Sequence, residues 1–492
     1  MKILFYSNTG LTSNQIGLTG EIISELISAD HTITFVWCDS VLDNCFFNKS
    51  QNPIGCASCQ SRQKVVLSLI KTNSIKHVTL KKLIDKKTIE IPKFQNLKEL
   101  SEYEYQGINI GTGIASSIIS HERNFDFENY KYQDLIEVEY KKSINVLANF
   151  NRFIEEEKPD SIYIFNGRFS ESWPVLNLAK KIGIEYNCIE SGAGYNYEIF
   201  KNSLPHSIEY RNNEIHRLWK EGHETKKKEI AKNWFTSRRD KTIKNDIVFT
   251  KDQEDNLLPP SFDKSKRNIA IMNSSEDELK VIKEWNTGLY SKQNEAILNI
   301  VKHFSGNEII HFILRVHPNL GSVNNSQIEE IRQFDFKNLT VIPPESNVDT
   351  YYLMDQCEKV ITFGSSTGVE STFWGNVSIL YGNSLYMHLD CVYTPKTFNE
   401  LVHLLNDSLL LPKNKEATFP FGYYMTKYGI KPQLFKFDKT KTSSFNGIKL
   451  KKFYFSSFPN LFRYLLKFKH WKNLHTLYFK QKLTFNNFLK YK

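Results

Sequence analysis

The stretch Thr362-Phe363-Gly364-Ser365-Ser366-Thr367-Gly368-Val369-Glu370, together with Arg315-Val316-His317-Pro318 upstream, decides the fold of this chain. An apolar, β-branched run precedes each motif, over 311–314 and 359–362. We therefore expect each motif to leave a buried strand, and the small residues of the first motif to open a helix. The carboxyl ends of strands in an open parallel sheet face a ligand-binding crevice, where a helix N-terminus favours a phosphate.

The small residues of the first motif have the chemistry that a phosphate requires. Ser365, Ser366, Thr367 and Gly368 are expected to hold it through hydroxyls and backbone amides. The structural alternative is an ordinary serine or threonine cap, with a glycine that allows close packing of helix and strand.

Three larger side chains flank this loop. Arg315 is expected to clamp phosphate with two parallel hydrogen bonds, and His317 to donate to the leaving phosphate or to a hydroxyl of the donor. Glu370, one turn into the helix, suits ribose hydroxyls, although it also complements the helix dipole. A surface ion pair for Arg315 and a structural role for His317 remain the alternatives.

Strand-like and helix-like runs alternate along most of the chain, which predicts an α/β protein with parallel, helix-covered sheets. A chain of 492 residues is too long for one core. We expect two Rossmann-like domains that face a central cleft, over 1–235 and 267–415, joined by a linker over 236–266. A basic, aromatic, helical tail is expected over 416–492. The predicted strands are 3–6, 33–37, 161–165, 184–189, 268–272, 309–316, 339–342, 360–363 and 377–381, and the predicted helices include 20–26, 137–157, 173–181, 293–304 and 350–356.

The composition is that of a globular protein, with 40% hydrophobic and 24% charged residues. Much of the net charge of +10 lies in the last fifty residues, where lysines alternate with Phe, Leu and Tyr. This pattern is typical of a helix on an anionic membrane surface and also of a helix that packs back on the core. No nucleic-acid-binding motif is present, so we expect no nucleic-acid partner.

The first strand candidate begins at the amino terminus, and its apolar run is too short for a signal peptide. No apolar run reaches the roughly eighteen residues that a membrane span needs. Seven cysteines without a secretion signal indicate a reducing compartment. We therefore expect a cytoplasmic protein, with peripheral attachment to the inner face of the cell membrane as an option for the tail.

Four cysteines lie within one short stretch. Cys56 and Cys59 have the spacing of half a zinc or thiol site, with Cys38 and Cys45 as upstream candidates for the other half. Buried structural cysteines are the commoner alternative, and we expect no metal. The sequence leaves the role of Cys56 and Cys59 open.

Together, Arg315-Val316-His317-Pro318, Val348-Asp349 and the segment 364–370 resemble the capsule polysaccharide biosynthesis family of glycosyltransferases, which includes the capsular Kdo transferases. Phe165-Asn166-Gly167-Arg168, Ile189-Glu190-Ser191-Gly192 and the segment 273–278 are also similar to stretches of such proteins. The resemblance covers residues 1–400 loosely and is specific only over 315–381.

The resemblance implies a GT-B fold, a nucleotide-sugar donor bound by the second domain, and no obligatory metal or other cofactor. The acceptor and a catalytic base then belong to the first domain. Glu190 ends an apolar strand and is the candidate base; Asn166, Arg168 and Gly192 are candidate acceptor-binding residues. The alternative for Glu190 is a loop carboxylate without a chemical role.

The sequence thus predicts a metal-independent glycosyltransferase that extends a bacterial surface polysaccharide, capsule or lipopolysaccharide, from a nucleotide sugar. Its expected partners are that donor, an oligosaccharide or lipid-linked acceptor, and an anionic membrane surface. Polyol-phosphate transferases of teichoic-acid synthesis have a similar paired-serine loop. Sugar-nucleotide 2-epimerases have a similar Ser-Gly-Gly loop followed by glutamates, although Gly368 and the single Glu370 depart from their double-glutamate pattern. The alternative outside enzymes is a silent scaffold of glycan assembly.

Overall fold

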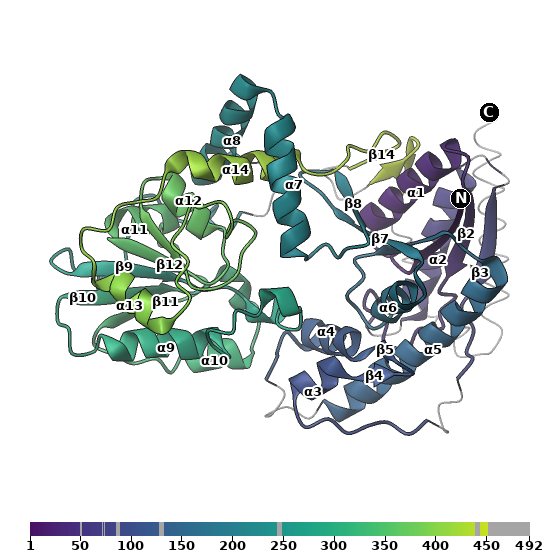
Figure 1. Cartoon of the computed structure of the whole chain (residues 1–492), viewed down its shortest axis with the longest axis horizontal. Coiled ribbons are helices and arrows are strands. Elements are labelled where there is room, and N and C mark those ends of the chain that lie inside the picture. Colours follow the sequence, from purple (N-terminus) through teal and green to yellow (C-terminus); the bar gives the residue numbers. More distant parts are fainter. Residues whose placement is uncertain are drawn as a thin grey trace, which may run out of the picture.

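The structure is a computed structural model that describes residues 1–49, 52–70, 72, 74–84, 89–126, 132–243, 248–437 and 443–450. It contains two large sheets that lie side by side (Figure 1). We call each sheet with its covering helices a lobe. No helix among these residues is long and apolar enough to cross a membrane.

The first lobe is built on a six-stranded sheet of order β3-β2-β1-β6-β7-β8. All neighbouring strands are parallel except β8, which runs antiparallel to β7. The strands are β1 Lys2–Ser7, β2 Thr32–Trp37, β3 Ile75–Thr79, β6 Ser161–Phe165, β7 Glu185–Ser191 and β8 Tyr197–Lys201. The helices of this lobe are α1 Ser13–Ser28, α2 Pro53–Ser68, α3 Leu97–Glu102, α4 Gly111–Glu122, α5 Gln133–Glu157 and α6 Trp173–Ile182, and a small hairpin joins β4 Glu104–Tyr105 to β5 Ile108–Asn109.

The second lobe has a fully parallel five-stranded sheet of order β11-β10-β9-β12-β13. Its strands are β9 Arg267–Met272, β10 Ile310–Arg315, β11 Leu339–Ile342, β12 Lys359–Thr362 and β13 Val377–Leu380. Its helices are α9 Gln293–His303, α10 Ser326–Ile331, α11 Thr350–Gln356, α12 Thr367–Phe373 and α13 Phe398–Asn406. Both sheets follow the Rossmann strand order, in which the third, second, first, fourth and fifth strands are neighbours. The predicted fold class, α/β with two Rossmann-like domains, is confirmed.

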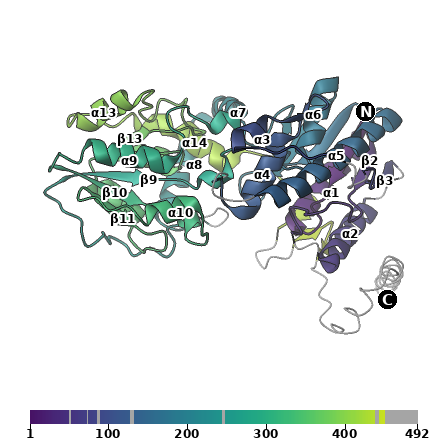
Figure 2. The same cartoon turned by 90° about the horizontal axis from the view of Figure 1, so that it is seen from below.

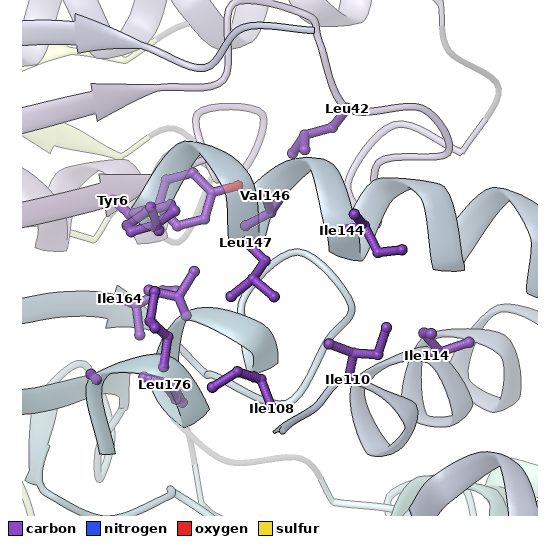
Figure 3. Close-up of a cluster of buried hydrophobic side chains, with 14 of the residues drawn as sticks. Tyr6, Leu42, Ile108, Ile110, Ile114, Ile144, Val146, Leu147, Ile164 and Leu176 are labelled. Atoms are coloured by element: carbon purple, nitrogen blue, oxygen red, sulfur yellow. The ribbon is translucent and has the colours of Figure 1, made fainter. Parts of the chain in front are cut away.

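Parallel sheets covered on both faces need largely apolar strands, and the central strands β1 and β9 meet this condition. Ile269, Ala270 and Ile271 of β9 are completely buried. In the first lobe, the long helix α5 buries one apolar face against the sheet, and side chains of β1, β6, α4 and α6 meet there (Figure 3). This packing holds the carboxyl ends of the strands in fixed positions.

The chain crosses between the lobes through helices α7 Ile208–Glu221 and α8 Glu224–Arg239, and it returns after α14 Phe419–Lys427 (Figures 1 and 2). Helices α7, α8 and α14 pack with the second lobe; for example, the rings of Phe235 and Phe373 stack with centroids 4.1 Å apart. The predicted domain limits stay predictions. The structure shows that the elements near the limit at residue 235 belong to the packing of the second lobe.

After α14, the chain runs back to the first lobe and forms a small three-stranded sheet beside α1. Its strands are β14 Phe435–Lys436, β15 Ser444–Phe445 and β16 Ile448–Lys449. The backbone amides of Gln433, Leu434 and Phe435 all donate to the buried carboxylate of Glu21 in α1. The rest of the predicted tail, 451–492, lies outside the described residues.

Candidate functional site

A cavity of about 500 Å³ lies at the carboxyl ends of β9, β10 and β12, where the strand order of the second sheet reverses. This switch point is where open α/β sheets bind ligands. We call it the strand-end cavity. Six of the predicted site residues line it: Arg315, His317, Ser365, Ser366, Thr367 and Glu370. The two motifs of the sequence therefore meet at one site.

The imidazole of His317 has a defined tautomer. Its Nδ1 accepts a hydrogen bond from the backbone amide of Asn319 at 3.2 Å, so the ring proton lies on Nε2. Burial, and secondly the positive charge of Arg315, lower the pKa of His317 to about 4. His317 is thus neutral near pH 7 and acts as a hydrogen-bond donor through Nε2.

Arg315 is buried, and its terminal nitrogens are already engaged. Nη1 donates to the carbonyl oxygen of Pro343 and Nη2 to that of Ser346. Each terminal nitrogen keeps a second N–H, so the expected two-pronged clamp on a phosphate stays a prediction. Among the described residues, Nε has no hydrogen-bond partner. Burial lowers the pKa of Arg315 to about 10, so the side chain still carries its charge at neutral pH.

Asn273, directly after β9, is a site residue for which sequence analysis proposed no role. Its Oδ1 accepts from the backbone amide of His317 at 2.8 Å, which fixes the strand end that carries the imidazole. Its Nδ2 is buried, and none of the described residues accepts from it. The sequence does contain one signal for Asn273, namely its position directly after an apolar strand, in the polar segment 273–278.

The paired-serine loop leaves β12 through Gly364, whose φ of 137° is a conformation that side chains rarely adopt. Ser365 Oγ accepts from the backbone amide of Thr367 at 3.3 Å and from its hydroxyl at 2.9 Å. Within the described ranges, the amides of Ser365 and Ser366 have no hydrogen-bond partner. Gly368 does not line the cavity; it is buried against Tyr386 and Thr362, as the packing alternative predicted.

Glu370 forms the floor of the strand-end cavity and is 1% exposed. It accepts hydrogen bonds from the hydroxyls of Tyr351 and of Ser366, the latter at 2.8 Å. Arg238 of α8 lies 3.4 Å from the same carboxylate. Glu370 therefore joins the loop, helix α11 and helix α8, and its predicted contact with ribose hydroxyls stays a prediction.

The predicted acceptor-side residues lie in the first lobe and do not line the strand-end cavity. Glu190 ends β7 and accepts from Asn166 Nδ2 at 2.7 Å and from the amide of Ser191 at 2.9 Å. Burial raises the pKa of Glu190, while these hydrogen bonds and the charges of Arg211 and Arg168 act in the opposite direction. Asn166, Arg168 and Glu190 form one cluster, whereas Gly192 lines a different cavity.

The lobes touch beside the strand-end cavity. Arg123, at the carboxyl end of α4, forms an ion pair with Asp277 and donates to Ser275 Oγ at 3.3 Å. Asn325 Nδ2 donates to the backbone oxygen of Arg123 at 2.6 Å. Because Ser275 lines the cavity, this contact connects the first lobe directly to its wall.

The cysteines do not assemble a metal site in the part of the chain that the structure describes, where no three His, Cys, Asp or Glu side chains are placed to hold an ion. Cys56 and Cys59 lie in the first turns of α2, and Cys59 Sγ donates to the backbone oxygen of Asn8 at 3.7 Å. Burial raises the pKa of Cys59 to about 12 and that of Cys38 to about 11. These thiols are therefore protonated near pH 7.

No known family profile matches the chain, and no curated protein matches it. The solved structures similar to it include the Thermosulfurimonas dismutans KpsC β-Kdo 2,4 transferase, with a TM-score of 0.36 and 12% identity over 54% of this chain and 79% of that one. The β-Kdo 2,7 transferase of the same organism has a TM-score of 0.30 and 13% identity, covering 56% and 88% of the two chains. The Neisseria meningitidis UDP-GlcNAc 2-epimerase bound to UDP-GlcNAc has a TM-score of 0.26 and 12% identity, covering 88% and 95%. Similarities of this strength carry no information about the substrate of this chain.

Proposed function

We propose that this chain is a glycosyltransferase that moves a sugar from a nucleotide sugar to a bacterial surface polysaccharide, either capsule or lipopolysaccharide. One observation supports the proposal above all. Residues that line the strand-end cavity at three adjacent strand ends carry hydrogen-bond donors that no described residue engages: Asn273 Nδ2, Arg315 Nε, His317 Nε2 and the amides of Ser365 and Ser366. Phosphate oxygens only accept hydrogen bonds near neutral pH, so such a group of donors fits the diphosphate or monophosphate of a sugar nucleotide.

The same donors suit the transition state of glycosyl transfer. As the bond between the sugar and the phosphate breaks, negative charge develops on the departing phosphate oxygen, and fixed donors in a sheltered site stabilise it. His317 contributes a hydrogen bond from a neutral ring. With a pKa of about 4, it carries too few protons at pH 7 to act as a general acid.

The acceptor hydroxyl must lose its proton, and Glu190 is the proposed base. Its raised pKa makes the carboxylate a stronger base than an exposed glutamate. Asn166 orients it from the end of β6. Because Glu190 lies in the first lobe and outside the strand-end cavity, the proposal requires the lobes to close on the bound donor, which also excludes water.

The proposed setting follows from the same chemistry. The donors in the cavity provide the charge stabilisation that a metal would otherwise supply, so we propose that the reaction needs no metal. A lipid-linked acceptor places the enzyme at the cytoplasmic face of the membrane. The lysine-rich segment that ends the sequence is suited to bind anionic lipid there.

The test is turnover of CMP-, UDP-, GDP- and CDP-linked sugars and polyols by the purified chain, with identification of the released nucleotide and of the transferred group. We expect one nucleotide sugar to be consumed, with transfer of the sugar alone. Release of CMP from a CDP-polyol together with transfer of a polyol phosphate would establish the teichoic-acid type of reaction instead. Isomerisation of a UDP-sugar without an acceptor would establish an epimerase.

A catalytically silent scaffold is distinguished from an enzyme by substitutions in the candidate site that leave the amount of protein in the cell unchanged. We expect the triple variant Glu190→Gln, His317→Ala, Ser366→Ala to abolish glycan formation in cells at normal protein abundance. Unchanged glycan formation in that variant would leave the scaffold as the surviving explanation. Binding of nucleotides, followed by thermal shift, shows separately whether the cavity is occupied, because a ligand that binds only the folded form raises its stability.

A further inference from the structure

A second cavity, of about 440 Å³, lies where the first lobe meets the crossing helices. We call it the helix cavity. One wall is the loop Gly192–Gly194 after β7, and the other walls are α8 and the end of α14. Its lining residues are Gly192, Ala193, Gly194, Ile230, Asn233, Trp234, Ser237, Ile243, Met425, Thr426 and Tyr428.

The walls of the helix cavity are held in place by main-chain contacts between the lobes. The amide of Ala193 donates to the carbonyl oxygen of Tyr428 at 3.0 Å. Beyond it, Tyr197 and Ile430 exchange two backbone hydrogen bonds of 2.9 and 2.6 Å. A Cβ on Gly429 would lie 2.7 Å from the carbonyl oxygen of Tyr197, so this close approach requires a glycine. These backbone contacts therefore fix the positions of the walls of the cavity.

The chemistry of the lining is specific. None of the described residues that line it is charged; two of them carry aromatic rings (Trp234 and Tyr428), and three carry neutral polar groups (Asn233, Ser237 and Thr426). A pyranose ring has one apolar face, which packs on aromatic side chains, and hydroxyls that pair with amides and alcohols. A charged ligand would lose its hydration without gaining a counter-charge.

The helix cavity adjoins the proposed reaction site from the acceptor side. Gly192 lies two residues after Glu190, the proposed base. Helix α8 borders both cavities: Trp234 lines the helix cavity and Arg238, one turn later, lines the strand-end cavity. The guanidinium of Arg238 lies over the ring of Trp234, 4.9 Å from its centroid. A polymer in the helix cavity would thus lie against the loop that follows Glu190 and against the helix that also lines the strand-end cavity.

We propose that the helix cavity binds a neutral sugar residue of the acceptor glycan, remote from the hydroxyl that reacts. The inference rests on the proposed function, because an acceptor glycan is meaningful only for a glycosyltransferase. Such a subsite would make the enzyme prefer acceptors that carry at least one neutral sugar in addition to the sugar that reacts. The binding energy of this additional sugar adds to the binding energy of the reacting sugar.

The test uses Asn233→Phe, which places a ring in the helix cavity from an exposed helical position, and Asn213→Phe as its matched control. Asn213 is an exposed asparagine of α7 that lines neither cavity. Saturation-transfer NMR is recorded with maltohexaose, N,N′,N″-triacetylchitotriose, a trigalacturonate and dodecanoate as probes. We expect at least one neutral glycan to bind wild type and Asn213→Phe, with a tenfold or greater loss of affinity in Asn233→Phe.

Two outcomes overturn the inference. In one, no neutral glycan binds wild type, or its binding is the same in Asn233→Phe. In the other, dodecanoate or the trigalacturonate is the probe that Asn233→Phe displaces. Nucleotide thermal shifts measured on the same samples separate the two proposals. Nucleotide binding without glycan binding refutes the helix-cavity inference alone, whereas glycan binding without any nucleotide binding refutes the proposed function.

Discussion

At the scale of single residues, the neighbours of a side chain determine which of its chemistries remain available. A histidine after a buried strand could be an acid, a base or a donor; the amide of Asn319 on Nδ1 leaves His317 as a donor through Nε2. The carbonyl oxygens of Pro343 and Ser346 take one N–H from each terminal nitrogen of Arg315. The sequence shows neither contact, because the first depends on the turn that the chain makes after His317 and the second on the loop that follows another strand, β11.

We expect His317→Ala to lower kcat/KM about 100-fold, as loss of one fixed donor to a developing anion does. His317→Gln keeps an amide donor and should retain most of the activity. Steady-state kinetics of both variants measure the difference. Equal losses in the two variants would show that the imidazole acts by another chemistry.

The lowered pKa of His317 also predicts a pH dependence of stability. The folded state favours the neutral ring, so the contribution of His317 is fully present above pH 6.5 and is lost as the pH falls toward its folded pKa of about 4. Urea unfolding of wild type and His317→Gln between pH 7 and pH 4 measures it. We expect wild type to lose more stability than the variant over this range, and parallel curves would contradict the buried, neutral ring.

We expect Glu190→Gln to lower kcat by about 10²- to 10⁴-fold while leaving nucleotide binding unchanged, because the amide cannot accept the proton. The matched control is Glu185→Gln at the opposite end of β7, where the carboxylate pairs with Lys201 near the surface. Single-turnover rates and nucleotide thermal shifts are the measurements. Full activity of Glu190→Gln would remove this residue from the mechanism.

At the scale of elements, patterns of apolar residues predicted the central strands well because these strands are buried on both faces. The central strand Ser161–Phe165 is at the predicted residues, and so are the edge strand Leu339–Ile342 and the helix Thr350–Gln356. The pattern gave no strand for β8, which is an antiparallel addition to the sheet edge. It also gave no helix for α2, whose apolar residues do not form a clear stripe. The pairing of an antiparallel edge strand, and the packing of a helix without an apolar stripe, depend on neighbouring elements. A local sequence pattern contains no information about these neighbours.

Helix α12 depends on a close approach at Gly368. A Cβ at this position would lie 2.3 Å from the hydroxyl of Tyr386 and 2.7 Å from Thr362 Oγ1. We expect Gly368→Ala to lower the free energy of unfolding by about 1–3 kcal/mol and to weaken nucleotide binding, because α12 must shift. Gly306→Ala, where nothing lies within 4 Å of the added carbon, is the control and should change little. Denaturant unfolding measures both variants.

At the scale of the whole molecule, the sequence predicted two Rossmann-like domains and gave a tail that packs back on the core as one of two alternatives, but it did not indicate that the chain returns to the first lobe. Gly17 and Gly20 of α1 allow Phe435 and Phe445 to pack where any Cβ would be too close. Contacts between residues more than 400 positions apart leave no local pattern in either segment. The same reason explains why the packing of α8 and α14 on the second lobe was not predicted.

The return of the chain is anchored at Glu21, whose carboxylate accepts from three consecutive backbone amides. We expect Glu21→Ala to cost about 3 kcal/mol, because three buried donors lose a charged acceptor. Hydrogen exchange should accelerate at residues 433–435 more than in β9. The exposed Glu229→Ala on α8 serves as the control. Unchanged exchange at 433–435 would show that the apolar contacts of Phe435 and Phe445 suffice.

This return has a consequence for how the molecule can be divided. A cut between α8 and β9 would give one piece that ends with α7 and α8, which complete the apolar cluster of the other lobe. The second piece would contain β14–β16, which cover α1. Each half carries a portion of its counterpart's core. Neither piece should therefore fold well by itself, and the two expressed together should reassemble into an active heterodimer.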